Sequence, residues 1–135
     1  MKVSLSFAII TAALAWRVCD PLEHGASGTG LVFDTTAVRA AVAECAGGGT
    51  VLFSAGKTFL TGAFNVSNNT ELRVDGTLLG SPNNTDYVLV NPLPWYGPDP
   101  PQAVARALAG LDADPREWSP FIGSWYSNNI SITGS

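Results

Sequence analysis

Acid–base chemistry is the first possibility that the side chains of this sequence raise. Asp112 and Asp114 lie two residues apart in a proline-flanked segment, and a general acid and a general base are commonly supplied by such carboxyl groups. The same composition favours a solvated turn, which is the interpretation we prefer. His24 is the only histidine and lies in a glycine-rich entry segment. Because of this place in the entry segment, we interpret it as a solvated or packing residue. A serine or cysteine nucleophile with a base partner is also not evident.

The spacing of the other polar residues does not predict a phosphate or metal site. Gly56-Lys57-Thr58 resembles the end of a phosphate-binding loop, but the earlier glycine that this loop requires would stand at the position of Val51. One histidine and two cysteines do not have zinc spacing, and the acidic residues do not converge on a calcium site. We therefore expect no cofactor and no metal.

The two cysteines and four glycosylation triplets suggest an oxidising compartment. Cys19 and Cys45 are most simply interpreted as one disulfide, with two free buried thiols as the alternative. The Asn-x-Ser/Thr triplets, which are candidates for N-glycosylation, begin at Asn65, Asn68, Asn83 and Asn129.

The first fifteen residues have the pattern of a secretory signal peptide. Lys2 precedes an apolar run, and Ala13-Leu14-Ala15 is a small-x-small cleavage signal. The run is shorter than the ~20 residues that a membrane-spanning helix needs. We predict a signal peptide over residues 1–15 and a single domain over residues 16–135. The mature protein is expected to be extracellular or in the cell wall, with no membrane contact after cleavage.

Charge and aromatic residues limit the class of partner. The net charge is −4, whereas a nucleic-acid partner requires a basic stripe, so we expect none. Trp95 and Tyr96, in a proline-rich excursion over residues 92–101, are weak candidates for contact with sugar faces. The preferred interpretation is that they pin the excursion onto the domain. Trp118 and Trp125 are interpreted as structural.

Residues 34–60 are expected to hold the other elements in place. Asp34 can cap a helix with its carboxylate, and Gly47-Gly48-Gly49 ends that helix. The residues spaced at i, i+3, i+4 and i+7 form one narrow apolar stripe; they are Val38, Ala41, Val42 and Cys45. A helix with one apolar stripe, followed by strands too short to form a sheet alone, indicates the capped start of a longer structure.

Short strands separated by polar turns are expected after the helix. They are Thr50–Phe53, Thr58–Leu60, Ala63–Val66, Thr70–Val74, Thr77–Leu79, Tyr87–Val90 and Ile130–Thr133. Residues 16–33 are interpreted as loop and turn, and Gln102–Ala109 as a two-turn helix. Asp75-Gly76 suits a tight hairpin, but regularly spaced short strands also suit a solenoid.

Several segments in order carry a family resemblance. They are Gly25-Ala-Ser-Gly28-Thr-Gly30, Ala-Val-Arg-Ala-Ala-Val-Ala-Glu-Cys45, Gly-Gly-Gly-Thr-Val-Leu-Phe-Ser-Ala-Gly56, Glu71-Leu-Arg-Val-Asp-Gly-Thr-Leu-Leu-Gly80 and Asn129-Ile-Ser-Ile-Thr-Gly134. Over nearly all of residues 19–135 the chain resembles the N-terminal part of the polygalacturonases, glycoside hydrolase family 28, and the related pectate-lyase-like proteins. The resemblance implies an all-β, right-handed parallel β-helix of about two coils with a short capping α-helix. Thr29, Phe33 and Ser54 depart from the family pattern at turns and caps.

The resemblance also implies an activity whose catalytic residues this chain lacks. Such enzymes hydrolyse α-1,4-linked galacturonan in pectin by inversion, with two carboxyl groups ~6.5–9.5 Å apart. The family's catalytic segments belong to later coils, and Asn84-Thr85-Asp86 matches one of them without its following glycine. We expect no catalytic residue in these 135 residues, no activity of the fragment itself, and a pectin-type polysaccharide as the partner of the parent protein. The alternatives are a non-catalytic carbohydrate-binding or structural β-helix and a calcium-dependent pectate-lyase-type relative. Oligomeric state is left open.

Overall fold

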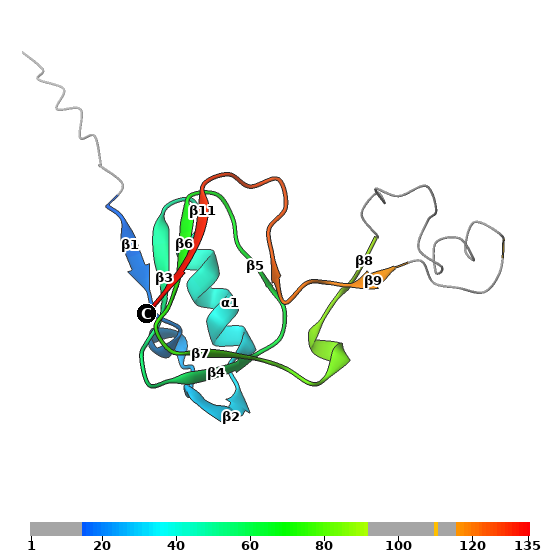
Figure 1. The fold of residues 1–135 in the computed structure, drawn as a ribbon, viewed down its shortest axis with the longest axis horizontal. Helices are drawn as coiled ribbons and strands as arrows, with labels where there is room; N and C mark the ends of the chain where they lie inside the picture. Colours follow the sequence, from blue (N-terminus) through cyan, green and yellow to red (C-terminus); the bar gives the residue numbers. More distant parts are fainter. Residues whose placement is uncertain (1–14, 92–109, 111–115) are drawn as a thin grey trace, which may run out of the picture.

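The computed structural model describes residues 15–91, 110 and 116–135, which form the start of a parallel β-helix closed at one end by a helix (Figure 1). Three stacks of parallel strands make up its walls. The first stack, in spatial order, contains β1 (Arg17–Cys19), β3 (Gly49–Phe53), β6 (Thr70–Val74) and β11 (Ile130–Gly134). The second contains β2 (Thr29–Phe33), β4 (Thr58–Thr61) and β7 (Thr77–Gly80), and the third contains β5 (Phe64–Asn65) and β10 (Ile122–Gly123). The predicted right-handed parallel β-helix fragment is confirmed.

Strand register decides between the two topologies that the sequence left open. Thr70 of β6 pairs with Gly49 of β3, and Ile130 of β11 pairs with Thr70, always in parallel. Asp75-Gly76 therefore turns a corner between two stacks, and it does not form a hairpin. The amides of Asp75 and Gly76 donate to the carbonyl oxygen of Phe53 on the preceding coil, at 3.1 and 2.9 Å. These two hydrogen bonds fix the turn of this coil against the coil before it.

The core lies between the three stacks, beneath the capping helix. Phe53, Phe59 and Leu72 have no exposed surface. The ring of Phe53 lies 5.3 Å from that of Phe59 in an edge-to-face arrangement and 6.3 Å from that of Phe64. Burying each of these side chains stabilises the fold by about 1.5–3 kcal/mol relative to exposure, before the entropy of ordering is subtracted.

Helix α1 (Thr35–Glu44) covers the open end of the first coil. The four residues of its predicted apolar stripe are all buried, which confirms that face of the helix. Cys45, just after the helix, is joined to Cys19 of β1 by a disulfide whose Cα atoms are 6.0 Å apart. The bond fastens the first strand to the helix that caps the stack.

The predicted hydrogen bond between the side chain of Asp34 and the first turn of the helix is wrong. Asp34 occupies the N-cap position, but its carboxylate accepts no hydrogen bond from the first turn. It accepts instead from the amides of Ser27 and Gly28, at 2.6 and 3.1 Å. The buried carboxylate therefore organises the loop before β2 rather than the helix that follows it.

The prediction of loop and turn for residues 16–33 is also incorrect. This segment contains β1, the 3-10 helix η1 (Pro21–His24) and β2. β1 is three residues long and β2 contains Gly30, so local propensity is weak in both. They become strands because each adds to the edge of a stack, β1 on β3 and β2 on β4. Ser54 adds a further tie, donating from its hydroxyl to Asp20 at 2.5 Å.

After β7 the chain leaves the coil and later returns to it. The outgoing part contains η2 (Asn84–Asp86) and β8 (Leu89–Val90), and β8 pairs antiparallel with β9 (Glu117–Trp118) on the return. The predicted strands Ala63–Val66 and Tyr87–Val90 are shorter than expected, because only residues 64–65 and 89–90 find partners. Residues 1–14, 92–109 and 111–115 lie outside the described residues; they include most of the predicted signal peptide, Trp95, Tyr96, the helix Gln102–Ala109, Asp112 and Asp114.

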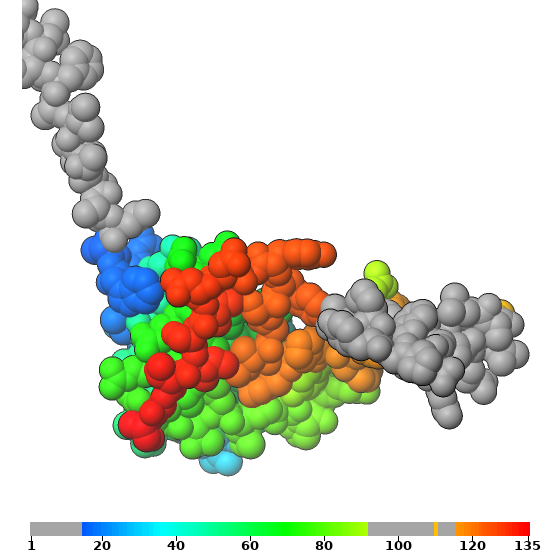
Figure 2. Space-filling model, turned by 45° about the horizontal axis from the view of Figure 1, so that its top comes forward, coloured from blue at the N-terminus to red at the C-terminus, as the bar shows by residue number. Residues whose placement is uncertain are grey.

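The last coil ends in strands paired on one side only. β11 lies at the end of its stack, and in Figure 2 it runs, in red, across one face of the molecule beside the segment that leads into it. Ile132 on β11 is exposed. α1 is ten residues long, and no helix in the described part of the chain is long and apolar enough to cross a membrane.

Candidate functional site

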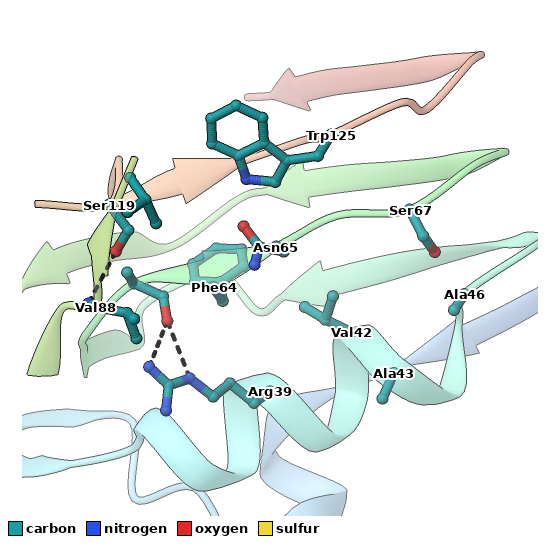
Figure 3. A pocket seen from close by; sticks show the side chains of 12 residues that line it. Arg39, Val42, Ala43, Ala46, Phe64, Asn65, Ser67, Val88, Ser119 and Trp125 are labelled. Carbon is teal, nitrogen blue, oxygen red and sulfur yellow. Dashed lines mark hydrogen bonds between the residues drawn. The ribbon is translucent and has the colours of Figure 1, made fainter. Parts of the chain in front are cut away.

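A pocket of about 500 Å³ lies between α1 and the third strand stack (Figure 3). Helix α1 contributes Arg39 and Val42 to its lining, and β5 contributes Phe64 and Asn65. The two stems of the excursion contribute Val88 and Ser119, and the turn between β10 and β11 contributes Trp125. The pocket thus forms only where the helical cap, the coil and the excursion come together.

Arg39 is the only charged residue among the described lining residues. Its Nε and Nη2 donate to the carbonyl oxygen of Ala63 at 2.9 and 2.6 Å, and Nη2 also reaches the carbonyl oxygen of Asp86 at 3.4 Å. Within the described residues Nη1 has no partner. Neutral carbonyl groups hold the guanidinium in place and leave its charge unneutralised. The pocket is therefore locally positive in a chain of net charge −4.

Unpaired polar groups also occur in the lining of the pocket. The hydroxyl of Ser67 is buried without a hydrogen-bond partner. The side-chain amide of Asn65 and the indole N–H of Trp125 have no protein partner in the described part of the chain. Asn65 also lies close to the next coil, since a Cβ placed on Gly123 would be 2.3 Å from its Oδ1. Glycine at position 123 leaves room for the amide at the pocket.

Trp125 provides an accessible aromatic surface. Its side chain lies along one wall of the pocket near Asn65, and the residue is 39% exposed (Figure 3). The sequence suggested a structural role for this residue, and the fold places it in the lining of a cavity instead. A flat ring beside hydrogen-bonding groups suits a ligand with both apolar and polar faces.

A second feature, the ladder around Glu71, is suited to stability rather than catalysis. The hydroxyl of Thr50 donates to Glu71 at 2.8 Å and that of Thr133 at 2.9 Å, so one carboxylate ties β3, β6 and β11 together. These hydrogen bonds, with Thr50 as the larger cause, lower the pKa of Glu71. A general acid in hydrolysis must instead hold its proton near neutral pH, which requires a raised pKa. The ladder therefore lacks the property that an acid catalyst needs.

The other polar motifs of the sequence take part in local contacts. Asn84-Thr85-Asp86 forms η2, and the carboxylate of Asp86 accepts a hydrogen bond from the hydroxyl of Ser81. His24 contacts Glu44 at 2.8 Å, on the surface between η1 and α1. The asparagines of the four glycosylation triplets are all exposed. No cluster of three or more potential metal ligands occurs among the described residues.

The sequence alone did not predict that Arg39 and Trp125 line a pocket. One signal was available for Arg39, which is the only lysine or arginine between Arg17 and Lys57. It stands between the apolar and small residues Ala37, Val38, Ala40 and Ala41 of the helix. No comparable signal marks Trp125, because its position depends on the return of the excursion to the coil.

Comparison with known proteins gives a match at the level of structure. No protein-family model and no curated protein matches the sequence. Among solved structures, the chain is similar to the family 28 exopolygalacturonase of Yersinia enterocolitica, with a TM-score of 0.65 and 25% sequence identity. The match covers 89% of this chain and 20% of that enzyme. The predicted resemblance to the N-terminal part of family 28 enzymes is confirmed at the level of the fold.

Proposed function

We propose that this chain is the N-terminal, end-capping part of a secreted pectin-degrading glycoside hydrolase of the polygalacturonase type. The observation that carries the proposal is the structural match to a family 28 exopolygalacturonase over 89% of the chain. The motifs that suggested the family lie on the elements that define the fold, from the loop at Gly25 to β11. In this proposal the substrate is galacturonan and the bond is cleaved by inverting hydrolysis.

The contribution of these residues is to close and align the β-helix. α1 shields the core of the first coil, and the disulfide between Cys19 and Cys45 fixes the first strand against it. Solenoid stability accumulates over neighbouring repeats, so a closed first coil stabilises the coils stacked on it. The carboxyl groups that perform hydrolysis are proposed to come from coils that pack beyond β11.

The test is an activity assay on two proteins, the 135-residue chain and a longer protein that contains it. We expect the longer protein to release reducing ends from polygalacturonate, without calcium, and the chain alone to release none. Unsaturated products that appear only with calcium would instead support the lyase-type alternative. Retention on insoluble pectin without any bond cleavage by the longer protein would support a non-catalytic β-helix. Activity of the chain alone would overturn the proposed division of roles.

A further inference from the structure

Two neighbouring amides at the start of β5 hold both ends of the excursion against the coil. The amide of Ala63 donates to the carbonyl oxygen of Asp86, in the outgoing part, at 3.2 Å. The amide of Phe64 donates to the carbonyl oxygen of Phe121, on the return, at 3.1 Å. Both ends of the excursion are therefore attached at one point of the third strand stack.

Arg39 binds the carbonyl group that lies between these two amides. Its Nε and Nη2 both donate to the carbonyl oxygen of Ala63, at 2.9 and 2.6 Å (Figure 3). Nη2 also lies 3.4 Å from the carbonyl oxygen of Asp86. A hydrogen bond from a charged donor contributes more to stability than one from a neutral donor. One side chain of α1 thus fixes the residue to which both ends of the excursion are attached.

We propose that Arg39 is a latch that couples helix α1 to the ribbon of β8 and β9, the two paired strands at the base of the excursion. With the guanidinium in place, Ala63 is fixed and both ends of the ribbon are held against the coil. Without it, the ribbon opens more readily while the stacked coils stay folded. Val88 and Ser119 form part of the wall of the pocket, so the latch also sets the position of that wall.

The ribbon depends on such a tie because it has little packing of its own. β8 and β9 pair over two residues each. The amide of Ser119 donates to the carbonyl oxygen of Val88 at 2.7 Å, but Val88 is 63% exposed. Trp118 of β9 is half exposed. Segments with few buried apolar contacts open locally at a low free energy, so the loss of one charged contact changes their opening strongly.

Gly62 provides the close approach that the latch requires. A Cβ at this position would lie 2.5 Å from the carbonyl oxygen of Asp86, the group that accepts from Ala63 and lies near Arg39. Gly62 does not have a positive φ, so an alanine suits the backbone there, and the nearest neighbours of its Cβ are all atoms of Asp86. Gly62→Ala is therefore a second way to displace Asp86, and it leaves Arg39 intact.

The test is amide hydrogen exchange, measured by NMR on the intact, disulfide-bonded chain. Arg39→Met keeps an unbranched side chain of good helix propensity and removes every donor. The amides of Ala63, Phe64 and Ser119 are expected to exchange at least about tenfold faster, because the variant lacks a charge-assisted contact that opening of the ribbon must otherwise break. The matched control is Arg73→Met, at an exposed arginine of β6 whose Nε binds a carboxylate, and it should leave these three rates unchanged.

Gly62→Ala should accelerate the exchange of the same amides although Arg39 is unchanged. If Arg39 only stabilised the helix, Arg39→Met would accelerate the amides that exchange through global unfolding, such as those of the buried strands β3 and β6, and not those of the ribbon. Unchanged exchange of Phe64 and Ser119 in Arg39→Met, or equal acceleration of them in Arg73→Met, would overturn the latch. Where Arg39→Met does not fold, unchanged exchange in Gly62→Ala would overturn it as well.

Discussion

The carboxylate of Asp34 accepts a hydrogen bond from the amide of Ser27 at 2.6 Å, seven residues earlier in the chain. The carboxylate is buried, with Asp34 only 3% exposed, and it also accepts from the amide of Gly28. Because α1 follows Asp34 directly, this contact fixes where the capping helix starts relative to the loop that enters β2. The pair thus joins the first wall of the β-helix to the helix that closes it.

Replacing Asp34 is expected to loosen this junction. Asp34→Ala removes both backbone contacts and should lower the free energy of unfolding by about 2–4 kcal/mol, because the buried amide of Gly28 and the partly buried amide of Ser27 lose their acceptor. Asp34→Asn keeps one acceptor oxygen and should fall between wild type and Ala. Urea unfolding followed by circular dichroism measures the difference, and Glu23→Gln on the surface of η1 is the control. Equal stability of Asp34→Ala and wild type would contradict this role.

The sequence predicted the capping helix well and the contacts of its first residue incorrectly. The stripe of Val38, Ala41, Val42 and Cys45 follows from helical periodicity, which is a local property, and all four are buried. The choice of partner for Asp34 depends on where the loop at Ser27 lies after folding. N-cap preference describes the helix alone, so it does not include donor groups outside the helix, here the amides of Ser27 and Gly28, that compete for the carboxylate.

Loss of the disulfide is expected to destabilise the closed end. Cys19 and Cys45 are 26 residues apart in sequence, and the chain-entropy model assigns a loop of this size about 3–4 kcal/mol. The double variant Cys19→Ala with Cys45→Ala should therefore unfold at a lower urea concentration than the oxidised protein. Reduced wild-type protein serves as the comparison that keeps both sulfur atoms. A midpoint that does not change on reduction would show that the bond does not stabilise the fold.

Gly76 is expected to tolerate no side chain at the corner between β6 and β7. A Cβ at this position would lie 2.4 Å from the carbonyl oxygen of Ser54 and 2.6 Å from that of Lys57, both of them backbone atoms of the preceding coil. Gly76→Ala should destabilise the protein by about 1–3 kcal/mol, as overpacking of a close contact does. Gly56→Ala is the matched control, since it has a positive φ of 71° but open space around its Cβ. Its expected cost is about 1 kcal/mol. A larger loss for Gly56→Ala than for Gly76→Ala would contradict the explanation by close approach.

The candidate site was less predictable from sequence than the fold. Short strands at regular spacing suited a solenoid as well as a hairpin, and the resemblance to family 28 implied the parallel coils. The pocket instead joins Arg39 on α1 to Trp125 before β11, and the excursion lies between them in sequence. The aromatic residues chosen from sequence, Trp95 and Tyr96, were selected for their place in that excursion and lie outside the described residues. Residues that come close together only because a long insertion returns to the coil leave no periodic pattern in the sequence.

Secretory processing provides a test of the compartment proposed for this protein. Expression with residues 1–15 in a glycosylating eukaryotic host should place the product in the medium, with Trp16 as its first residue. Glycosidase treatment should lower its mass, and Asn83→Gln should remove one glycan, because Asn83 is exposed in the turn that begins η2. Intact-mass and peptide mass spectrometry measure both results. A product that stays in the cell with Met1 retained would contradict the signal peptide.

The ladder around Glu71 predicts how stability changes with pH. Hydrogen bonds from Thr50 and Thr133 lower the pKa of Glu71 in the folded state below the ordinary value of 4.5. The stabilisation from this group is therefore fully present above pH 4.5 and is lost as the pH falls through the lower pKa of the folded protein.

Thr50→Val should raise the pKa of Glu71 toward its ordinary value and reduce the loss of stability in this acidic range. Thr133→Val should have a smaller effect of the same sign, because Thr50 is the larger cause. NMR titration of the Glu71 side-chain carboxyl carbon measures the pKa, and urea midpoints at neutral and acidic pH measure the stability. Thr77→Val, on the exposed face of β7, is the control that should change neither. A pKa of Glu71 that is the same in wild type and Thr50→Val would show that the ladder does not hold the carboxylate in its ionised form.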